Sequence, residues 1–154
     1  MRNIPVLIAV VCLAAIAGAQ PPAAQEATLA ELRRHAQAML ATLRALDVDG
    51  ALALYDQSPT FRHVDNGKVT AWPELERQMR QFLTTAKENH LRWEGEPTII
   101  LLGNDAAVVF GLHQFSGVTA DGTVIPPHTG VWTGVLRRIG GKWKIVHSHS
   151  SDAH

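Results

Sequence analysis

Two histidines near the C-terminus share one face of a predicted strand. Alternation along residues 142–150 places Trp143, Ile145, His147 and His149 on the same side. This side is the more apolar of the two, so we expect it to face the interior and to carry both imidazoles inward. Histidine changes its charge near neutral pH and acts as a general acid or base when a substrate proton lies within hydrogen-bond reach. The pattern therefore predicts His147 and His149 as candidate catalytic residues of an interior site.

Three further histidines can join this pair in one pocket. His113 lies within a predicted strand and is a third catalytic candidate, while His63 in a hairpin and His128 at a strand entrance are expected to line the pocket. Each can equally be an ordinary core imidazole that is hydrogen-bonded to a neighbour. A base also needs an orienting partner, but Asp56 and Asp65 have the positions of cap or turn residues.

A zinc site is a more specific alternative for the same histidines. His-x-His on a strand places two imidazoles on one side, and a third from His113, His128 or His63 can complete a three-histidine site with an open position. The spacing fits two ligands and does not identify the third, so we predict no metal and no other cofactor. His35 and His154 are expected on a helix surface and in the C-terminal tail.

Aromatic side chains can form an apolar wall around these imidazoles. An apolar cavity with a few polar groups is the usual site for a small molecule. Plain core packing is the alternative, and it would fill the cavity. The predicted pocket-lining aromatics are Tyr55, which is the only tyrosine, Phe61, Trp72, Trp93 and Trp132.

Three helices are predicted in the first half of the chain, to position this wall. Apolar residues at spacings of three and four predict a helix over 28–46, a short one through 51–55 and a third over about 73–86. The start signals are Thr28 with Glu31 as a capping box, Asp47 or Asp49 as the second cap, and Pro73 in the first turn of the third helix.

The remaining elements are strands. Residues 60–70 indicate a hairpin that turns at Asp65-Asn66-Gly67. Further strand candidates are 90–102, 106–117, 131–138 and 142–150, separated by turns at 103–105, 121–122 and 140–141. Helices followed by strands with short connections favour an α+β fold in which the helices pack on one face of an antiparallel sheet.

Both faces of strand 106–117 are partly apolar. Val109, His113 and Phe115 alternate with Val108, Phe110 and their neighbours. One face should cover the helices, and the other can meet a second subunit, because a broad apolar patch usually marks an interface. Scattered surface hydrophobic residues are the alternative. We expect a homodimer.

Length and composition fit one globular domain. The chain has 154 residues, 46% of them hydrophobic, with 14 basic and 14 acidic side chains. The hydrophobic content excludes a disordered chain. The charge balance argues against a nucleic-acid-binding protein, which usually shows a basic excess.

The N-terminus has the pattern of a secretory signal. Arg2 precedes an apolar run over 4–16, and Ala17-Gly18-Ala19 supplies small residues before a cleavage point. The run is shorter than the ~20 residues of a membrane anchor. We therefore predict a signal peptide at 1–19, a Pro/Ala/Gln linker at 20–27 and an exported protein, periplasmic or secreted, without a membrane contact after cleavage. Cleavage removes Cys12, the only cysteine, which excludes disulfides and thiol chemistry.

The last hairpin resembles that of the SnoaL-like proteins in the nuclear transport factor 2-like superfamily. Residues 137–151 show a basic strand end, a glycine turn, a tryptophan, an aliphatic residue and His-x-His-x-Ser. They are also similar to the association domain of calcium/calmodulin-dependent kinase II. Residues 46–55 resemble the second helix of the family and 102–109 its usual hairpin. The resemblance covers about 28–151, which we take as the domain.

The resemblance implies a curved antiparallel sheet that forms a cone around three helices, with a pocket at the open end. Members include ketosteroid isomerases, polyketide cyclases, dehydratases, binding modules and scaffolds, so the fold alone does not give a reaction. Some relatives carry arginine on the penultimate strand, where this chain has Val131, Trp132 and Thr133. This departure argues against an anionic ligand.

The leading hypothesis is an exported domain that binds a small, mostly apolar molecule in its cone. Cofactor-independent acid/base chemistry of the isomerase, cyclase or dehydratase type would then use His147, His149 or His113. The alternatives are a non-catalytic dimeric interaction module and a histidine-ligated zinc enzyme. The sequence does not identify the ligand or the reaction.

Overall fold

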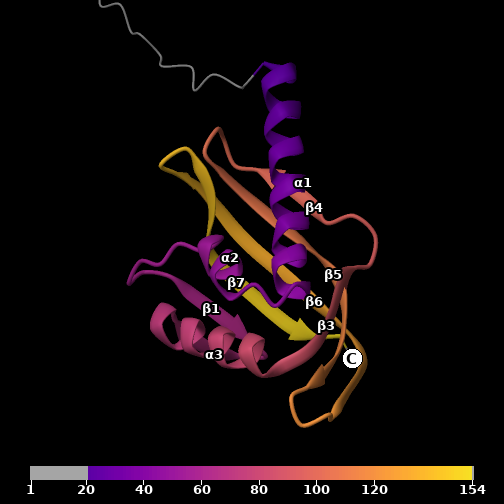
Figure 1. Cartoon of the computed structure of the whole chain (residues 1–154). Coiled ribbons are helices and arrows are strands. Elements are labelled where there is room, and N and C mark those ends of the chain that lie inside the picture. The colour runs from indigo at the N-terminus through magenta and orange to yellow at the C-terminus, as the bar shows by residue number, and fades with distance from the viewer. Residues whose placement is uncertain (1–20, 154) are drawn as a thin grey trace, which may run out of the picture.

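Three helices lie against the concave face of one curved, open sheet in the computed structural model, which describes residues 21–153 (Figure 1). The predicted signal peptide and His154 lie outside the described residues. The α+β expectation is confirmed. The helices are α1 (Pro22–Arg44), α2 (Val48–Ala53) and α3 (Trp72–Thr85), and the strands are β1 (Arg62–Asp65), β2 (Lys68–Ala71), β3 (Ala86–Trp93), β4 (Thr98–Leu101), β5 (Ala106–Thr119), β6 (Val124–Ile139) and β7 (Lys142–Asp152).

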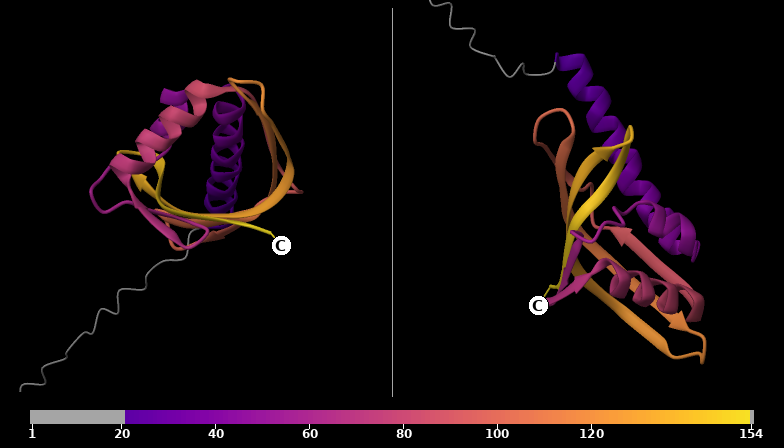
Figure 2. Two further views of the ribbon diagram at one scale, coloured as in Figure 1. Left: turned by 90° about the horizontal axis from the view of Figure 1, so that it is seen from below. Right: turned by 90° about the vertical axis from the view of Figure 1, so that its left-hand side faces the viewer.

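The sheet has the strand order β2-β1-β7-β6-β5-β3, and β4 pairs with the other end of β5. Neighbouring strands are antiparallel except for β1 and β7, which run parallel, so the expectation of a wholly antiparallel sheet is wrong at this pairing. Figure 2 shows the sheet curving around α1, with α3 beside the opening. No helix in residues 21–153 has the length and apolar character needed to cross a bilayer.

The first helix begins earlier than its sequence suggests. It starts at Pro22, so most of the predicted 20–27 linker is helical, and the proline fits because the first helical residue needs no N–H partner. The predicted capping box is wrong, because the Thr28 hydroxyl donates to the Ala24 carbonyl inside the helix, at 3.0 Å. His35 is half-buried rather than on the helix surface, and burial, with a smaller effect of Lys144, lowers its pKa to about 4.

Local turn chemistry is confirmed at two points. Asp47 caps α2, with its Oδ1 accepting a hydrogen bond from the Gly50 N–H at 2.9 Å. Asn66 and Gly67 have φ values of 45° and 84°, which is the two-residue turn that matches the twist of a hairpin.

Three strand boundaries differ clearly from the prediction. The candidate at 90–102 is two strands, β3 and β4, which pair with different parts of β5. Strand β3 begins at Ala86, directly after α3, so Ala86 does not belong to the third helix as predicted. Strand β6 begins at Val124 and continues past Pro126, because the β5–β6 register shifts there.

An ion pair joins α1 to the far end of the sheet. Arg138 Nη2 lies 2.6 Å from Glu31 Oε2, and Trp143 Nε1 donates to the same oxygen at 3.2 Å. The Arg138 guanidinium also stacks 4.7 Å from the centre of the Trp143 ring. The hydrogen bond from Arg138, followed by the one from Trp143, lowers the pKa of Glu31. This cluster connects α1 to β6 and β7.

We predict that Glu31→Gln lowers the free energy of unfolding by about 1 kcal/mol, because the amide loses the charge that Arg138 requires. Urea denaturation followed by circular dichroism measures the effect. Glu26→Gln is the matched control, since the Glu26–Arg33 pair on the same helix is more exposed and joins no second element. Equal losses in both variants would contradict a role for Glu31 in holding α1.

Candidate functional site

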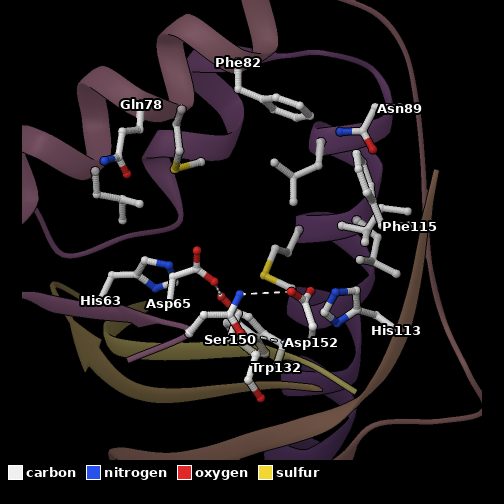
Figure 3. A pocket seen from close by; sticks show the side chains of 18 of the residues that line it. His63, Asp65, Gln78, Phe82, Asn89, His113, Phe115, Trp132, Ser150 and Asp152 are labelled. Carbon is white, nitrogen blue, oxygen red and sulfur yellow. Dashed lines mark hydrogen bonds between the residues drawn. The ribbon is translucent and has the colours of Figure 1, made fainter. Parts of the chain in front are cut away.

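A cavity of about 480 Å³ lies between α1, α3 and the concave face of the sheet (Figure 3). Its walls are mainly apolar, with Leu40 from α1, Met79 and Phe82 from α3, and Phe115 from β5. Its polar groups come chiefly from β1 and the C-terminal end of β7. A cavity of this size and lining has the character of a small-molecule site.

A bulge in β7 decides which side chains of that strand reach the cavity. Leu136 pairs with Ile145 and Val135 pairs with His147, so Val146 has no partner on β6. One extra residue reverses the alternation beyond it. Ile145 therefore faces inward before the bulge, and Ser148, which is 0% exposed, faces inward after it.

The expected inward orientation of His147 and His149 is wrong for this reason. Both are partly exposed, and neither lines the cavity. They follow the alternation of the outer face, where His147 pairs with Val135 and His149 with Thr133. Ser150 and Asp152 occupy the inward positions that the sequence analysis gave to the two imidazoles.

The other predicted residues divide between the cavity and the core. His63, His113, His128, Tyr55, Trp93 and Trp132 line the cavity as expected. Phe61 and Trp72 do not, and the pocket-lining prediction is wrong for them. Their rings pack edge-to-face, 5.7 Å apart, and Phe61 makes the same contact with Tyr55 at 5.6 Å. Burial raises the pKa of Tyr55 to about 12, so its hydroxyl stays neutral.

His113 lies across the sheet from Asp152, with only a glycine between them. It pairs with Gly130 on β6, which in turn pairs with Asp152 on β7. A Cβ on Gly130 would come within 2.7 Å of His113 Cε1, so the ring occupies the space that the missing side chain leaves. Burial, and then His128, lower the pKa of His113, while Asp152 acts in the opposite direction. Its Nδ1 is buried and finds no partner within residues 21–153.

His63 is held by the neighbouring strand. Its Nδ1 lies 2.9 Å from Ser148 Oγ, because the parallel β1–β7 pairing sets the two residues side by side. Burial is the main cause that lowers the pKa of His63, and Asp65 opposes it. His128 is exposed at the rim, where its ring packs edge-to-face on Phe115 at 5.2 Å. Burial thus favours the neutral form of both His63 and His113.

Sequence reasoning missed two carboxylates at the cavity. Asp65 accepts a hydrogen bond from Ser150 Oγ at 2.9 Å, and Asp152 accepts one from Asn66 Nδ2 at 3.1 Å. Both residues line the cavity. Asp65 was interpreted as a turn residue, although it lies two positions after His63 on one strand. That spacing alone places both on the same face.

Two further lining residues carry polar atoms without partners. Asn89 and Trp93 are 6% and 8% exposed and share the inward face of β3. Neither Asn89 Oδ1 nor Trp93 Nε1 finds a hydrogen-bond partner in the described part of the chain. An unpaired buried polar atom costs about 1–3 kcal/mol, so such atoms are uncommon. Asn89 was missed because the predicted strand began at residue 90, directly after it.

The zinc alternative has no ligand set within residues 21–153. No three histidine, cysteine, aspartate or glutamate side chains gather there in an arrangement that could hold a metal ion. The bulge in β7 separates the His147/His149 pair from the histidines of the cavity.

Comparison with known proteins matches residues 33–153 to the SnoaL-like domain family. No curated protein matches. A nuclear transport factor 2-like superfamily protein from Salmonella enterica serovar Typhimurium is similar over 84% of this chain and 94% of its own, at 21% identity and a TM-score of 0.75. A candidate dehydratase of the same superfamily from Streptomyces avermitilis is similar over 84% of this chain and 99% of its own, at 16% identity and a TM-score of 0.72. The association domain of C. elegans CaMKII is similar over 82% of this chain and 96% of its own, at 20% identity and a TM-score of 0.65. At such low sequence identities, these structural matches show a shared fold and nothing more.

We predict that acidification from about pH 7.5 to about pH 5.5 destabilises the protein. Unfolded His35 binds a proton near pH 6.5, whereas folded His35 does so only near pH 4, so the unfolded state takes up more protons in this window. The contribution of His35 is about 1 kcal/mol, and His63 and His113 act in the same direction because burial lowers their pKa values too.

Urea denaturation at the two pH values measures this loss. His35→Gln should remove the part that belongs to His35, whereas His90→Gln, at a largely exposed side chain, should not. An unchanged pH dependence in His35→Gln would contradict the assignment.

Proposed function

The chain belongs to the SnoaL-like domain family, and on that basis we propose that it binds a small, largely apolar molecule in the cavity between α1, α3 and the sheet. The observation that carries the proposal is the pair of unpartnered polar atoms on Asn89 and Trp93 in the wall of that cavity. Their cost is recovered when a ligand supplies the missing hydrogen bonds after a small adjustment of the side chains. The apolar wall supplies the rest of the binding free energy.

His113 is the residue that we propose for acid/base chemistry on this molecule. A neutral imidazole accepts a proton at pH 7, and the nearby negative charge of Asp152 favours the protonated form that results. Such a reaction needs no cofactor and is of the isomerase, cyclase or dehydratase type. His147 and His149 have no part in it, because they lie outside the cavity.

We predict that naphthylethanol, a neutral aromatic probe, binds the protein and that Met79→Trp lowers its affinity by roughly ten-fold, because the larger side chain takes up cavity volume. Isothermal titration calorimetry measures both affinities. Leu112→Trp is the matched control, since Leu112 lies on the outer face and is 44% exposed. Equal affinities in the two variants would place the probe outside the cavity.

A second candidate function is that of a dimeric interaction module. The outer face of β4 and β5 exposes 48% of Ile100 and 44% of Leu112, and Phe110 lies between their rows. Contiguous apolar surface of this kind marks interfaces. The similarity in fold to the C. elegans CaMKII association domain is compatible with such a role.

We predict a solution mass of two chains at micromolar concentration and a shift toward one chain in Leu112→Asp, because a buried carboxylate without a partner disfavours association. Multi-angle light scattering measures the mass. Val69→Asp is the control, as Val69 is more exposed and lies on β2, away from β5. A wild-type mass of one chain would refute the dimer.

A further inference from the structure

Two carboxylates at the cavity have no cationic partner. The Asp65 carboxylate accepts a hydrogen bond from Ser150 Oγ, and the Asp152 carboxylate accepts one from Asn66 Nδ2, both of them neutral groups. The Asp152 N–H donates to Asn66 Oδ1. Neither takes part in an ion pair within residues 21–153. Figure 3 shows both on the same side of the cavity, below the apolar wall. Two carboxylates therefore face the same space without an ion-pair partner in the described residues.

The remaining lining residues do not offset this charge. No lysine or arginine of the described chain lines the cavity. Burial lowers the pKa of His63 and of His113, which favours the neutral form of each imidazole. The penultimate strand contributes Trp132 to the wall. An anion entering the cavity would meet repulsion without a balancing partner, whereas a cation would be attracted.

The sheet register connects each carboxylate to an aromatic wall. Asp65 on β1 pairs with Ser150 on β7, which pairs with Trp132 on β6. Neighbouring strands lie ~4.8 Å apart, so about 10 Å separates the backbone of Asp65 from that of Trp132.

Asp152 heads the adjacent row, which runs through Gly130 and His113 to Trp93 on β3. The Trp93 and Trp132 rings lie 6.0 Å apart at 59°. A molecule that lies across the strands would thus have one end at the carboxylates and its body against two indoles.

We propose that the cavity takes an apolar amine, whose protonated nitrogen lies between Asp65 and Asp152 and whose hydrocarbon or aromatic body packs against Trp132 and Trp93. The proposal rests on the proposed function, since it specifies the ligand of the same cavity. The ammonium donates hydrogen bonds to the two carboxylates, which have acceptor capacity beyond their single donors. The indole faces add a favourable interaction with a cation.

Three probes with one ring system and different charges test this proposal: naphthylethylamine, naphthylethanol and naphthylacetate. Calorimetry on the full chain at pH 7 and low salt should give roughly ten-fold tighter binding of the amine than of the alcohol, and the weakest binding for the carboxylate. Raising the salt concentration should narrow the difference, because the carboxylates are exposed to solvent on one side.

The double variant Asp65→Asn/Asp152→Asn should bind the amine and the alcohol about equally, with the alcohol affinity close to that of the wild type. Asparagine keeps an acceptor oxygen for Ser150 and for Asn66, so the local hydrogen bonds survive the change. The matched control is Asp105→Asn/Glu96→Gln, which removes two negative charges from residues that do not line the cavity and should keep the preference for the amine.

Equal binding of amine and alcohol by the wild type, or an amine preference that survives the double variant, would overturn this inference and leave the proposed function intact. The absence of binding by all three probes would remove the proposed function, and the inference with it.

Discussion

One unpaired residue in β7 determines what the cavity can do. Side chains alternate along a strand with a period of two, so an extra residue exchanges the faces of everything beyond it. Without the bulge at Val146, the two imidazoles of the His-x-His pair would line the cavity. With it, hydroxyls and a carboxylate line the cavity, and the histidines lie on the outer face. The bulge thus replaces a basic wall by an acidic one.

Elements with local chemical causes could be predicted from the sequence. Asp47 caps α2 and Asn66-Gly67 turns the first hairpin because both depend on a side-chain oxygen or a backbone conformation within a few residues. The bulge has no such cause, because Val146 is an ordinary strand residue and its neighbours alternate normally. The direct passage from α3 into β3 at Ala86 also lacks a turn residue that would mark it. In both places the pairing with β5 or β6 decides the structure.

Absent side chains shape the cavity as much as present ones. Gly130 leaves room for the His113 ring, and Gly134 lies beneath the Trp132 ring on the same strand. The aromatic groups can therefore lie along the sheet instead of standing upright and filling the hollow. The sequence analysis left open whether the aromatics form a wall or plug the space. Gly134 beside the Trp132 ring and Gly111 beside the Trp93 ring leave room for these two side chains to form a wall. Phe61 and Trp72, which have no such neighbours, pack into the core.

The parallel contact between β1 and β7 joins segments that are far apart in the chain, since Ser150 and its hydrogen-bond partner Asp65 are separated by 85 residues. Contacts of such long range form late, because the loop between them must close before they contribute anything. The acidic edge of the cavity therefore depends on the completed pairing of β1 with β7. A ligand that contacts both β1 and β7 would bind only the folded protein. It would slow the separation of these two strands and would also shift the equilibrium toward the native state.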